Sequence, residues 1–328
     1  MKAIVLISGG LDSILAARLI KEQGIGIIPL YFKIPFCHKT KEIFGPLSLV
    51  KNNLGLDLET ADIGADFLGL LNQPRYGFGA NMNPCIDCKI LMLKKARGLL
   101  DDYKADFIVT GEVLGQRPMS QHRQALELIE KKSGLEGLLL RPLSAKLLPE
   151  TTPEKNGWIS REKLLNIGGR SRRPQVNLAR GFGIKDYPNA AGGCLLTDPK
   201  FSDRLKELIA HKELSLENIE LLKIGRHFRI SGQAKLVVAR DEKEGKELEN
   251  LARPGDYLFF PNDQLAGPTS LGRGEFNPDL INFSCSITCR YCDLNGAQEA
   301  EILINKEGAF SSLKVSPISD TELNKFRI

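Results

Sequence analysis

The sequence predicts an α/β fold for the first 150 residues, with helices on both faces of a parallel sheet, followed by a small α+β domain. Two observations carry this prediction. Short apolar runs alternate with helical repeats from residue 3 to residue 140, and this alternation is typical of parallel sheets. From about residue 215, the strand-like runs "LKIGRHFRI" and "AKLVVAR" follow one another across "SGQ", which is a hairpin pattern.

The elements of the first domain follow in chain order. Residues 3–7 form a β-branched apolar run, and apolar residues recur at helical spacing from Leu11 onward, so a strand leads directly into a helix. The same patterns predict strands at residues 25–32, 57–63, 106–109 and 137–140, and helices at residues 43–54, 91–103 and 121–132.

The middle of the chain has a different character. Residues 141–160 hold three Pro and show little periodicity, which indicates a long functional loop or a linker. Short helices are predicted at residues 160–167, 173–182 and 199–211. We therefore expect a first domain at residues 1–150, a basic loop and helical segment at 151–214 that completes the active site, and a C-terminal domain at 215–328.

The composition places the chain among ordinary water-soluble proteins. It has 328 residues, of which 42% are hydrophobic and 26% charged. No apolar run approaches the length of a bilayer span, and the N-terminus shows no signal-peptide pattern. Seven cysteines in unequal clusters do not fit a disulfide framework. We therefore expect a cytoplasmic protein without membrane contact, whose cysteines serve metal or redox chemistry.

Positive charge is concentrated in one segment. The net charge of the whole chain is +5, but residues 155–212 alone contain twelve Lys or Arg and five Asp or Glu. A basic segment in a nearly neutral chain suggests a face that binds a polyanion. A solvated helical surface is the alternative.

The stretch "VLISGGLDSILAARLI", residues 5–20, has the features of an anion-binding turn. Its two glycines carry no Cβ and let backbone N–H groups approach a ligand. The helix that follows adds its unpaired N–H groups and the positive end of its dipole. Two serines supply hydroxyl donors, and the Asp can hold a metal ion that accompanies phosphate. A capped βα turn without a ligand is the plainer alternative. The candidate anion-binding residues are Ser8, Gly9, Gly10, Leu11, Asp12 and Ser13.

Three further cysteines form a candidate sulfur or metal site. Cys85 and Cys88 stand in "NPCIDCKILMLKKAR", at the start of a predicted helix and beside Lys89, and we expect both features to lower the thiol pKa. Cys194 lies in the Gly-rich "NAAGGCLLTDP".

Three interpretations of these cysteines remain open. They are independent buried thiols, a catalytic pair that carries and resolves a persulfide, or ligands of an iron–sulfur cluster with one open iron. Zinc prefers four ligands, and Cys37 or His38 could supply the fourth.

A second cysteine group, "CSITCRYC", has the Cys-x3-Cys-x2-Cys spacing of radical SAM enzymes. It lies near the end of the chain, with no barrel to follow. The spacing also places Cys285, Cys289 and Cys292 on one face of a helix. We therefore interpret them as buried small side chains.

The order of the motifs adds a resemblance to a known family. "SGGLDS" resembles the PP-loop of ATP pyrophosphatases. "TGEVLGQRPMSQ", where a strand ends at Thr110 and Gly111, and the later "RPLSAK" resemble segments of the 4-thiouridine synthetases. The Cys-x-x-Cys with a distant Cys is similar to the cluster-binding 2-thiouridine and 2-thiocytidine synthetases. "KIGRHFRI…KLVVARDEKEGKELENL…GPTSL" resembles the NFACT-R RNA-binding module. The 4-thiouridine synthetases carry a THUMP domain before the PP-loop, whereas "SGGLDS" begins here at residue 8, so we expect no such domain and expect RNA binding elsewhere in the chain.

This resemblance implies an adenine nucleotide alpha hydrolase-like, Rossmann-like fold and an ATP-dependent tRNA sulfurtransferase. The enzyme would adenylate a carbonyl oxygen of uridine or another pyrimidine, release pyrophosphate, and replace the oxygen with sulfur, which frees AMP. ATP and Mg²⁺ would bind at residues 8–13, with Thr110 and Gly111 close by. The partners would be tRNA and a sulfur donor, either a cysteine desulfurase, a carrier or free sulfide. The implied catalytic residues are Asp12, Cys85, Cys88 and Cys194, and the three cysteines are also implied ligands of a [4Fe-4S] cluster, in preference to zinc.

Two basic groups are candidate RNA contacts. Arg suits bidentate phosphate binding, and a strand that mixes Arg, His and Phe also permits base stacking. Exposed surface charge is the alternative for both groups. The first group is Arg170, Arg172 and Arg173 in "GGRSRRP", and the second is Arg226, His227 and Arg229 on a predicted strand.

Two other functions stay open at this point. One is a PP-loop enzyme that adenylates or sulfurates a small molecule, and the basic segment and C-terminal module argue against it. The other is a non-catalytic RNA-binding protein with a relic nucleotide site, and the intact "SGGLDS" argues against that.

Overall fold

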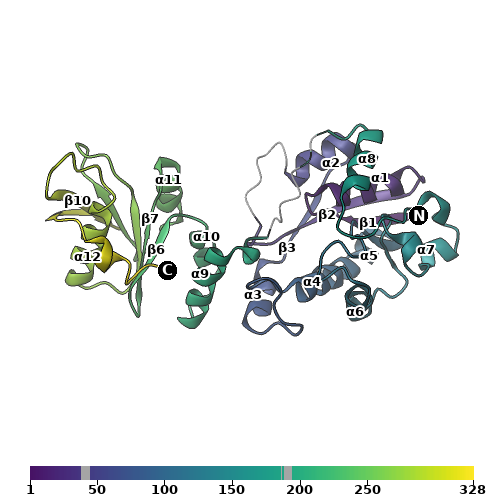
Figure 1. Ribbon diagram of the computed structural model, residues 1–328, viewed down its shortest axis with the longest axis horizontal. Coiled ribbons are helices and arrows are strands. Elements are labelled where there is room, and N and C mark those ends of the chain that lie inside the picture. Colours follow the sequence, from purple (N-terminus) through teal and green to yellow (C-terminus); the bar gives the residue numbers. More distant parts are fainter. Residues whose placement is uncertain (38–44, 186, 188–193) are drawn as a thin grey trace. The chain divides into compact units, whose positions relative to one another are not determined.

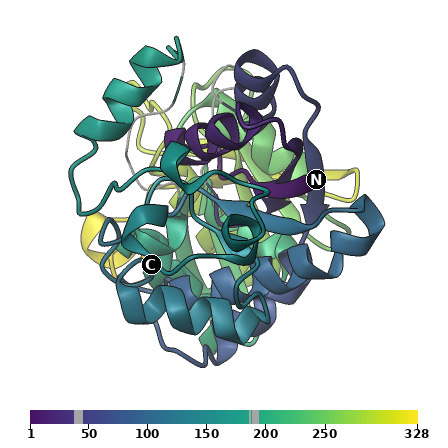
Figure 2. The same ribbon diagram turned by 90° about the vertical axis from the view of Figure 1, so that its right-hand side faces the viewer.

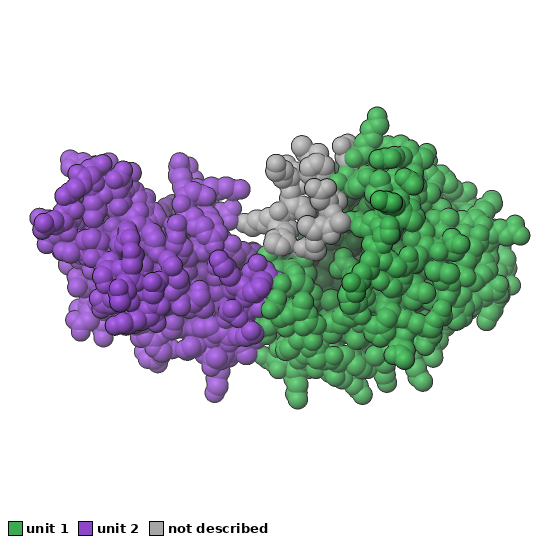
Figure 3. Space-filling model, in the orientation of Figure 1, with its two compact units in different colours: residues 1–197 green, residues 198–328 purple. Residues whose placement is uncertain are grey.

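The computed structural model describes residues 1–37, 45–185, 187 and 194–328, so His38 lies outside the described residues. The chain forms two compact units, Met1–Thr197 and Asp198–Ile328 (Figure 3). The segment expected at 151–214 is therefore divided between them, and Cys194 belongs to the first unit. Within the described residues, no helix has both the length and the apolar character that a membrane span requires.

A five-stranded parallel sheet forms the centre of the first unit, in the order β3-β2-β1-β4-β5. Figure 1 labels three of its strands, β1, β2 and β3. The order reverses at β1, which pairs with β2 on one side and with β4 on the other. This arrangement confirms the predicted Rossmann-like fold, and ligands of such sheets bind at the carboxyl ends of the strands where the order reverses. The strands are β1 (Lys2–Leu6), β2 (Gly26–Lys33), β3 (Glu59–Asp62), β4 (Phe107–Thr110) and β5 (Leu139–Leu140).

Helices cover both faces of this sheet (Figure 1, Figure 2). Alternate residues of β1 enter two different cores, because successive side chains of a strand point to opposite faces. Ala3 and Val5 pack with α1, α2 and α8, whereas Ile4 packs with α4 and α6. The helices are α1 (Leu11–Lys21), α2 (Pro46–Leu54), α3 (Gly64–Asn72), α4 (Cys85–Gly98), α5 (Leu100–Tyr103), α6 (Arg123–Ser133), α7 (Thr152–Lys155) and α8 (Arg173–Gly181).

Two helices of the first unit differ from the prediction. Helix α4 begins at Cys85 rather than at residue 91, and the buried Asp87 in its first turn accepts the N–H groups of Arg75 and Tyr76. The helix predicted at 160–167 is only a 3₁₀ turn, Arg161–Lys163. The residues after this turn are extended because the N–H groups of Leu165 and Ile167 donate to the backbone of residues 142–143.

The second unit is an α+β domain, as predicted. Its six-stranded antiparallel sheet has the order β11-β10-β8-β9-β7-β6. Helix α12 packs on one face in a core with Phe228, Phe259 and Ile302, and α10 and α11 pack on the other face around Val237 and Leu271. The strands are β6 (Arg226–Ser231), β7 (Ala234–Val238), β8 (Tyr257–Pro261), β9 (Ser270–Gly274), β10 (Ala300–Lys306) and β11 (Ala309–Val315). The helices are α9 (Pro199–Ala210), α10 (Leu216–Leu222), α11 (Glu242–Leu251), α12 (Pro278–Cys289) and α13 (Asp320–Leu323).

Candidate functional site

Residues 8–13, called loop 8–13 below, comprise the turn after β1 and the first residues of α1. Two serines of this loop hold it closed. The Ser13 hydroxyl donates to the Gly10 carbonyl at 2.8 Å and accepts the Ser8 N–H at 3.2 Å. Helix α1 begins at Leu11 without a hydrogen bond from a capping side chain. The N–H groups of its first turn are therefore available to a ligand, and the positive end of the helix dipole favours an anion there.

Two glycines shape this loop. Gly9 has a φ of +76°, which is the left-handed region that favours glycine. Gly111, just beyond β4, lies so close to α1 that an added Cβ would be 2.5 Å from the Asp12 carbonyl carbon and from the Ser13 nitrogen. Because both are backbone atoms, only glycine lets the end of β4 approach the first turn of α1. The structure thus brings Thr110 and Gly111 beside loop 8–13.

A chain of side chains holds Asp12 in this loop. The Gln116 amide donates to Asp12 Oδ2 at 2.7 Å, and the Gln175 amide donates to Gln116 Oε1 at 2.8 Å. The Arg172 guanidinium lies 3.7 Å from Asp12 Oδ1. Gln175 is on α8, so a residue of the basic segment reaches the loop through two hydrogen bonds.

Four cysteines come together at the same end of the unit. Cys37 and Cys194 face each other in an antiparallel bridge. Backbone and side-chain hydrogen bonds also join the segment just before α4 to the segment just after Cys194. Cys85 and Cys88 lie in the first turn of α4. Sequence reasoning considered Cys37 only as a zinc ligand, and nothing in the local sequence places it opposite Cys194.

The surroundings of these thiols correct one prediction. Burial raises the pKa of Cys88, and the neighbouring Cys194, Cys85 and Cys37 raise it further. Burial also raises the pKa of Cys85, and that of Cys194 to about 12. Lys89 lowers the pKa of Cys85 and Cys88, as expected, but burial outweighs it because a thiolate loses its hydration there.

A metal centre is not formed by these residues as they stand. Within the described part of the chain, no group of three or more His, Cys, Asp or Glu is arranged to hold a metal ion. The donor chemistry nevertheless suits an iron–sulfur cluster, because thiolates are its usual ligands. Bound metal would also deprotonate the buried thiols.

Lys89 connects the cysteine helix to the end of β4. Its ammonium lies 2.8 Å from Glu112 Oε1, and Arg141 Nε lies 3.1 Å from Glu112 Oε2. The Thr110 hydroxyl also donates to Glu112, at 3.2 Å. Burial would raise the pKa of the Glu112 carboxyl, but the two cations outweigh it and lower the pKa to about 2. Sequence reasoning missed Glu112, although it stands within the quoted "TGEVLGQRPMSQ".

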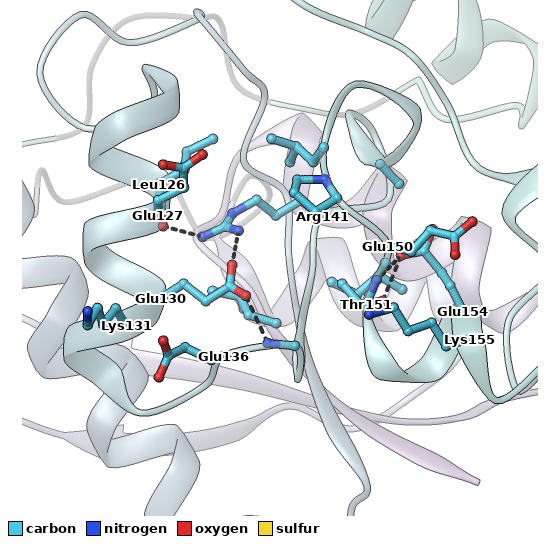
Figure 4. Close-up of a pocket in the computed structure, with 16 residues that line it drawn as sticks. Leu126, Glu127, Glu130, Lys131, Glu136, Arg141, Glu150, Thr151, Glu154 and Lys155 are labelled. Carbon is cyan, nitrogen blue, oxygen red and sulfur yellow. Dashed lines mark hydrogen bonds and ion pairs between the residues drawn. The ribbon is translucent and has the colours of Figure 1, made fainter.

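A separate cavity of about 370 Å³ lies among α6, β5 and α7 (Figure 4). Several charged side chains line it, and some of them pair with one another or with neighbouring groups. Arg141 pairs with Glu130 at 2.8 Å, and Glu154 accepts from Thr151 at 2.7 Å. None of the residues predicted for ATP, sulfur or RNA lines this cavity, so we assign it no ligand.

The structure separates the first basic group. Arg170 and Arg173 are exposed, whereas Arg172 is half-buried and turned toward Asp12. Arg170 and Arg173 are therefore available to a polyanion in solution, and Arg172 belongs to the surroundings of loop 8–13.

The structure corrects one member of the second basic group, His227. His227 is 1% exposed, and its Nε2 lies 2.7 Å from the Ile224 carbonyl oxygen. Arg229 pairs with Glu213 at 2.8 Å and also with Glu207, and Arg226 donates to a backbone carbonyl and stacks on the Tyr291 ring. These contacts lie within the second unit, and His227 is too buried to touch an RNA. Arg226 and Arg229 are half-buried, and an RNA contact by them stays a prediction.

An exposed aromatic residue was missed. Phe310 on β11 is 67% exposed, and its ring centroid lies 6.4 Å from that of Phe260 on β8. The alternation of "AFSSLKV" after the "EG" turn is the sequence signal that could have indicated it. An exposed ring on an open sheet face is a platform on which a nucleic-acid base can stack.

The second cysteine group lies in the core of the second unit. Cys285 and Cys289 of α12 are 0% exposed among apolar side chains. Cys292 lies just beyond the helix, and its thiol donates to the Thr288 carbonyl at 3.4 Å. These positions agree with buried small side chains.

Comparisons with known proteins support the predicted resemblance. Residues 1–146 match the family described as "Thiamine biosynthesis protein (ThiI)", and residues 225–327 match the "NFACT protein RNA binding domain". The tRNA-specific 2-thiouridylase MnmA of Marinobacter nauticus is 25% identical over 329 residues, which cover 88% of this chain and 79% of that protein. Its counterpart from Proteus mirabilis is 24% identical over 265 residues, which cover 75% of this chain and 68% of that protein.

One similar solved structure is the U34-tRNA thiolase NcsA from Methanococcus maripaludis with its [4Fe-4S] cluster. It is 18% identical, covers 68% of this chain and 72% of its own, and has a TM-score of 0.32. The sequence matches confirm the predicted resemblance: the chain joins an N-terminal PP-loop domain similar to ThiI and the tRNA thiouridylases to a C-terminal domain similar to the NFACT RNA-binding family.

Proposed function

We propose that this chain is an ATP-dependent tRNA sulfurtransferase, which adenylates a carbonyl oxygen of uridine or another pyrimidine and replaces it with sulfur. The observation that carries the proposal is one arrangement in the first unit. Loop 8–13 follows β1, Gly111 follows the neighbouring β4 and touches that loop, and the Lys89–Glu112 ion pair joins the end of β4 to the cysteine helix. The similarity of residues 1–146 to ThiI and of residues 225–327 to NFACT domains supports it.

The first step is activation of the base. ATP binds with its phosphates on loop 8–13 together with Mg²⁺, for which Asp12 Oδ1 is a suitable ligand because it is buried and has no hydrogen-bond partner. The carbonyl oxygen attacks the α-phosphorus, and the bond to pyrophosphate breaks. The N-terminus of α1 stabilises the negative charge that develops on the departing group. The carbonyl oxygen is a poor leaving group by itself, whereas AMP is a good one.

The second step is delivery of sulfur by the cysteines of α4 and Cys194. In one version, the thiols of Cys85, Cys88 and Cys194 hold a [4Fe-4S] cluster, which when bound supplies an open iron for incoming sulfide. In the other version, one thiol carries a persulfide whose outer sulfur attacks the activated carbon and displaces AMP. A second thiol then attacks the inner sulfur, so that the S–S bond of the persulfide breaks and a disulfide forms, which an external thiol reduces.

The RNA is held by surface charge and by the C-terminal domain. We place the phosphate contacts at Arg170 and Arg173, which are exposed on the basic segment. Because neutralised phosphates release counterions, the affinity for tRNA falls with salt concentration. Replacing both Arg by Ala lowers that slope by about two. An unchanged slope would remove them from the interface.

The test of the function is a reaction with unmodified tRNA transcripts, ATP, Mg²⁺ and a sulfur donor under anaerobic conditions, where the donor is either sulfide or cysteine with a cysteine desulfurase and a reducing thiol. We expect tRNA-dependent release of pyrophosphate and AMP, and a thiolated pyrimidine in the digested RNA by mass spectrometry. Asp12→Asn is the control that removes the metal ligand but keeps the Gln116 contact site. Pyrophosphate release triggered by a small molecule instead of tRNA would favour the small-molecule enzyme. RNA binding without any cleavage of ATP would favour the relic nucleotide site.

The iron and acid-labile sulfide of anaerobically purified protein distinguish the two sulfur versions. About four irons per chain, lost in Cys194→Ala, establish the cluster. A colourless, iron-free protein that thiolates tRNA with cysteine, a cysteine desulfurase and a reducing thiol, but not with sulfide alone, establishes the persulfide route.

A further inference from the structure

Loop 8–13 contains no cationic side chain of its own, and Arg172 places one beside it. Arg172 is the N-cap residue of α8, and its guanidinium lies 3.7 Å from Asp12 Oδ1. Its sequence neighbours Arg170 and Arg173 are exposed, but Arg172 is half-buried. One residue of the "RSRR" stretch is thus directed into the unit while the two around it face solvent.

The contacts around Arg172 leave hydrogen-bonding capacity unused. Arg172 Nε and Asp12 Oδ1 are buried atoms without a hydrogen-bond partner, and so is Gln175 Oε1. Gln175 itself is 0% exposed. Buried polar atoms without partners are costly, and three of them in one cluster beside an anion-binding helix end indicate a polar ligand.

The negative charge of a triphosphate explains why a ligand at loop 8–13 needs Arg172. Loop 8–13 offers N–H groups but contains no Lys or Arg. The Arg172 guanidinium adds positive charge there and can present a planar pair of donors to a phosphate, while Asp12 holds the Mg²⁺ of the nucleotide. The Gln175–Gln116–Asp12 chain of hydrogen bonds fixes the carboxylate, and so fixes the place from which Arg172 acts.

We propose that Arg172 is a triphosphate-binding residue of loop 8–13, and that Gln175 positions it through Gln116 and Asp12. This inference rests on the proposed function, because it takes ATP as the nucleotide bound there. It moves Arg172 from the predicted RNA contacts to the nucleotide site. It also makes α8 of the basic segment a part of that site, not only of the tRNA-binding surface.

The test is calorimetric binding of ATP and of AMP, each with Mg²⁺, to the full chain. We expect Arg172→Ala to lower the affinity for ATP about tenfold or more, the effect of losing a hydrogen bond between charged groups, and to leave the affinity for AMP nearly unchanged. Arg172→Lys keeps the charge and should recover part of the preference for ATP. Arg170→Ala and Arg173→Ala are matched controls from the same stretch, and both should bind ATP as the wild type does.

A double-mutant cycle tests the role of Gln175. If Gln175 acts through Asp12 and Arg172, Gln175→Leu lowers the ATP-over-AMP preference alone but has no further effect in the Arg172→Ala background. Additive losses would show that Gln175 is only a structural residue. Thermal unfolding of each variant identifies any that fail to fold.

The outcomes separate this inference from the proposed function. A wild-type chain that binds no ATP contradicts both. Wild-type affinity and selectivity in Arg172→Ala, with ATP bound normally, contradict the inference alone. A loss of tRNA affinity in Arg172→Ala without any change in ATP binding would return Arg172 to the RNA interface, and would also contradict the inference.

Discussion

Each unit of this protein contains a group of cysteines, four in the first and three in the second, and the two groups have different surroundings. Cys85, Cys88 and Cys194 come from two distant segments that hydrogen bonds bring together, beside Lys89 and at the end of the sheet where the strand order reverses. Cys285 and Cys289 lie on a single helix and contact the apolar core. Burial raises the pKa of thiols in both groups, so the pKa does not distinguish them.

Spacing along the chain is therefore a weak guide to the function of a cysteine. Cys-x3-Cys-x2-Cys is a more conspicuous pattern than a Cys-x-x-Cys followed by a Cys far along the chain. Yet the conspicuous group lies in a core, whereas the dispersed group lies beside Lys89, whose partner Glu112 follows the end of β4. The two groups differ because polar side chains from other segments lie near the dispersed group, whereas the group in the core packs against apolar side chains.

The largest expected effect separates the two groups by activity. Cys88→Ser and Cys194→Ser should each lower tRNA thiolation at least about a thousandfold, because they remove a sulfur-bearing thiol or cluster ligand. Pyrophosphate release should persist, since the thiols act after activation. Cys289→Ala is the control from the other group and should thiolate at a rate close to that of the wild type. Loss of thiolation in Cys289→Ala, with the fold intact, would contradict the view that the second cysteine group only packs in the core.

The second effect separates them by stability. Cys285→Ser places a hydroxyl without an assured partner in the core, and should lower the free energy of unfolding of the second unit by ~1–3 kcal/mol. The single tryptophan, Trp158, lies in the first unit. Urea unfolding followed by far-UV circular dichroism should therefore shift to lower urea, while the tryptophan fluorescence transition stays in place. An equal shift of both transitions would show that the effect is not local.

The third effect concerns the buried polar groups of the second unit. Burial, together with Lys235 and Arg204, lowers the pKa of His227 well below its usual 6.5. The unfolded chain takes up a proton below about pH 6.5 that the folded chain does not, so stability is complete above this pH and is lost as the pH falls, by ~1.4 kcal/mol per pH unit. His227→Gln should flatten this dependence in denaturant unfolding measured from pH 7 to pH 5. An unchanged slope would show that His227 titrates freely.

The smallest effect concerns the open sheet face. Phe310→Ala should weaken tRNA binding by ~1 kcal/mol, the lower end of a base-stacking contribution. Leu313 lies on the same strand, is also exposed and points to the opposite face. Leu313→Ala is therefore a matched control, and binding titrations at fixed salt should show no change for it. Equal losses in both variants would argue against stacking at Phe310.

Local patterns were sufficient for the alternation of strands and helices in the first unit, although they missed short helices such as α3 and α7, because hydrophobic periodicity and turn residues act over a few positions. They were also sufficient to place loop 8–13 at the start of α1, where ATP binding stays a prediction, because this placement depends on consecutive residues. They failed for the ion pairs of Arg229, since its partners Glu207 and Glu213 lie in another part of the chain. They failed for the Gln175–Gln116–Asp12 chain for the same reason, because three segments must fold together before any of its hydrogen bonds exists.

The Lys89–Glu112 ion pair has a consequence for the timing of the proposed reaction. Lys89 directly follows Cys88, and Glu112 stands two residues after Thr110 at the end of β4, so this pair fixes how far the sulfur-bearing helix lies from the strand beside the nucleotide loop. In the proposed reaction, the thiol that delivers sulfur is therefore in place before the base is activated. The adenylated base then lies at a constant distance from the sulfur-bearing thiol, which does not have to reach it by diffusion. Such proximity shortens the lifetime of an intermediate that water would otherwise hydrolyse.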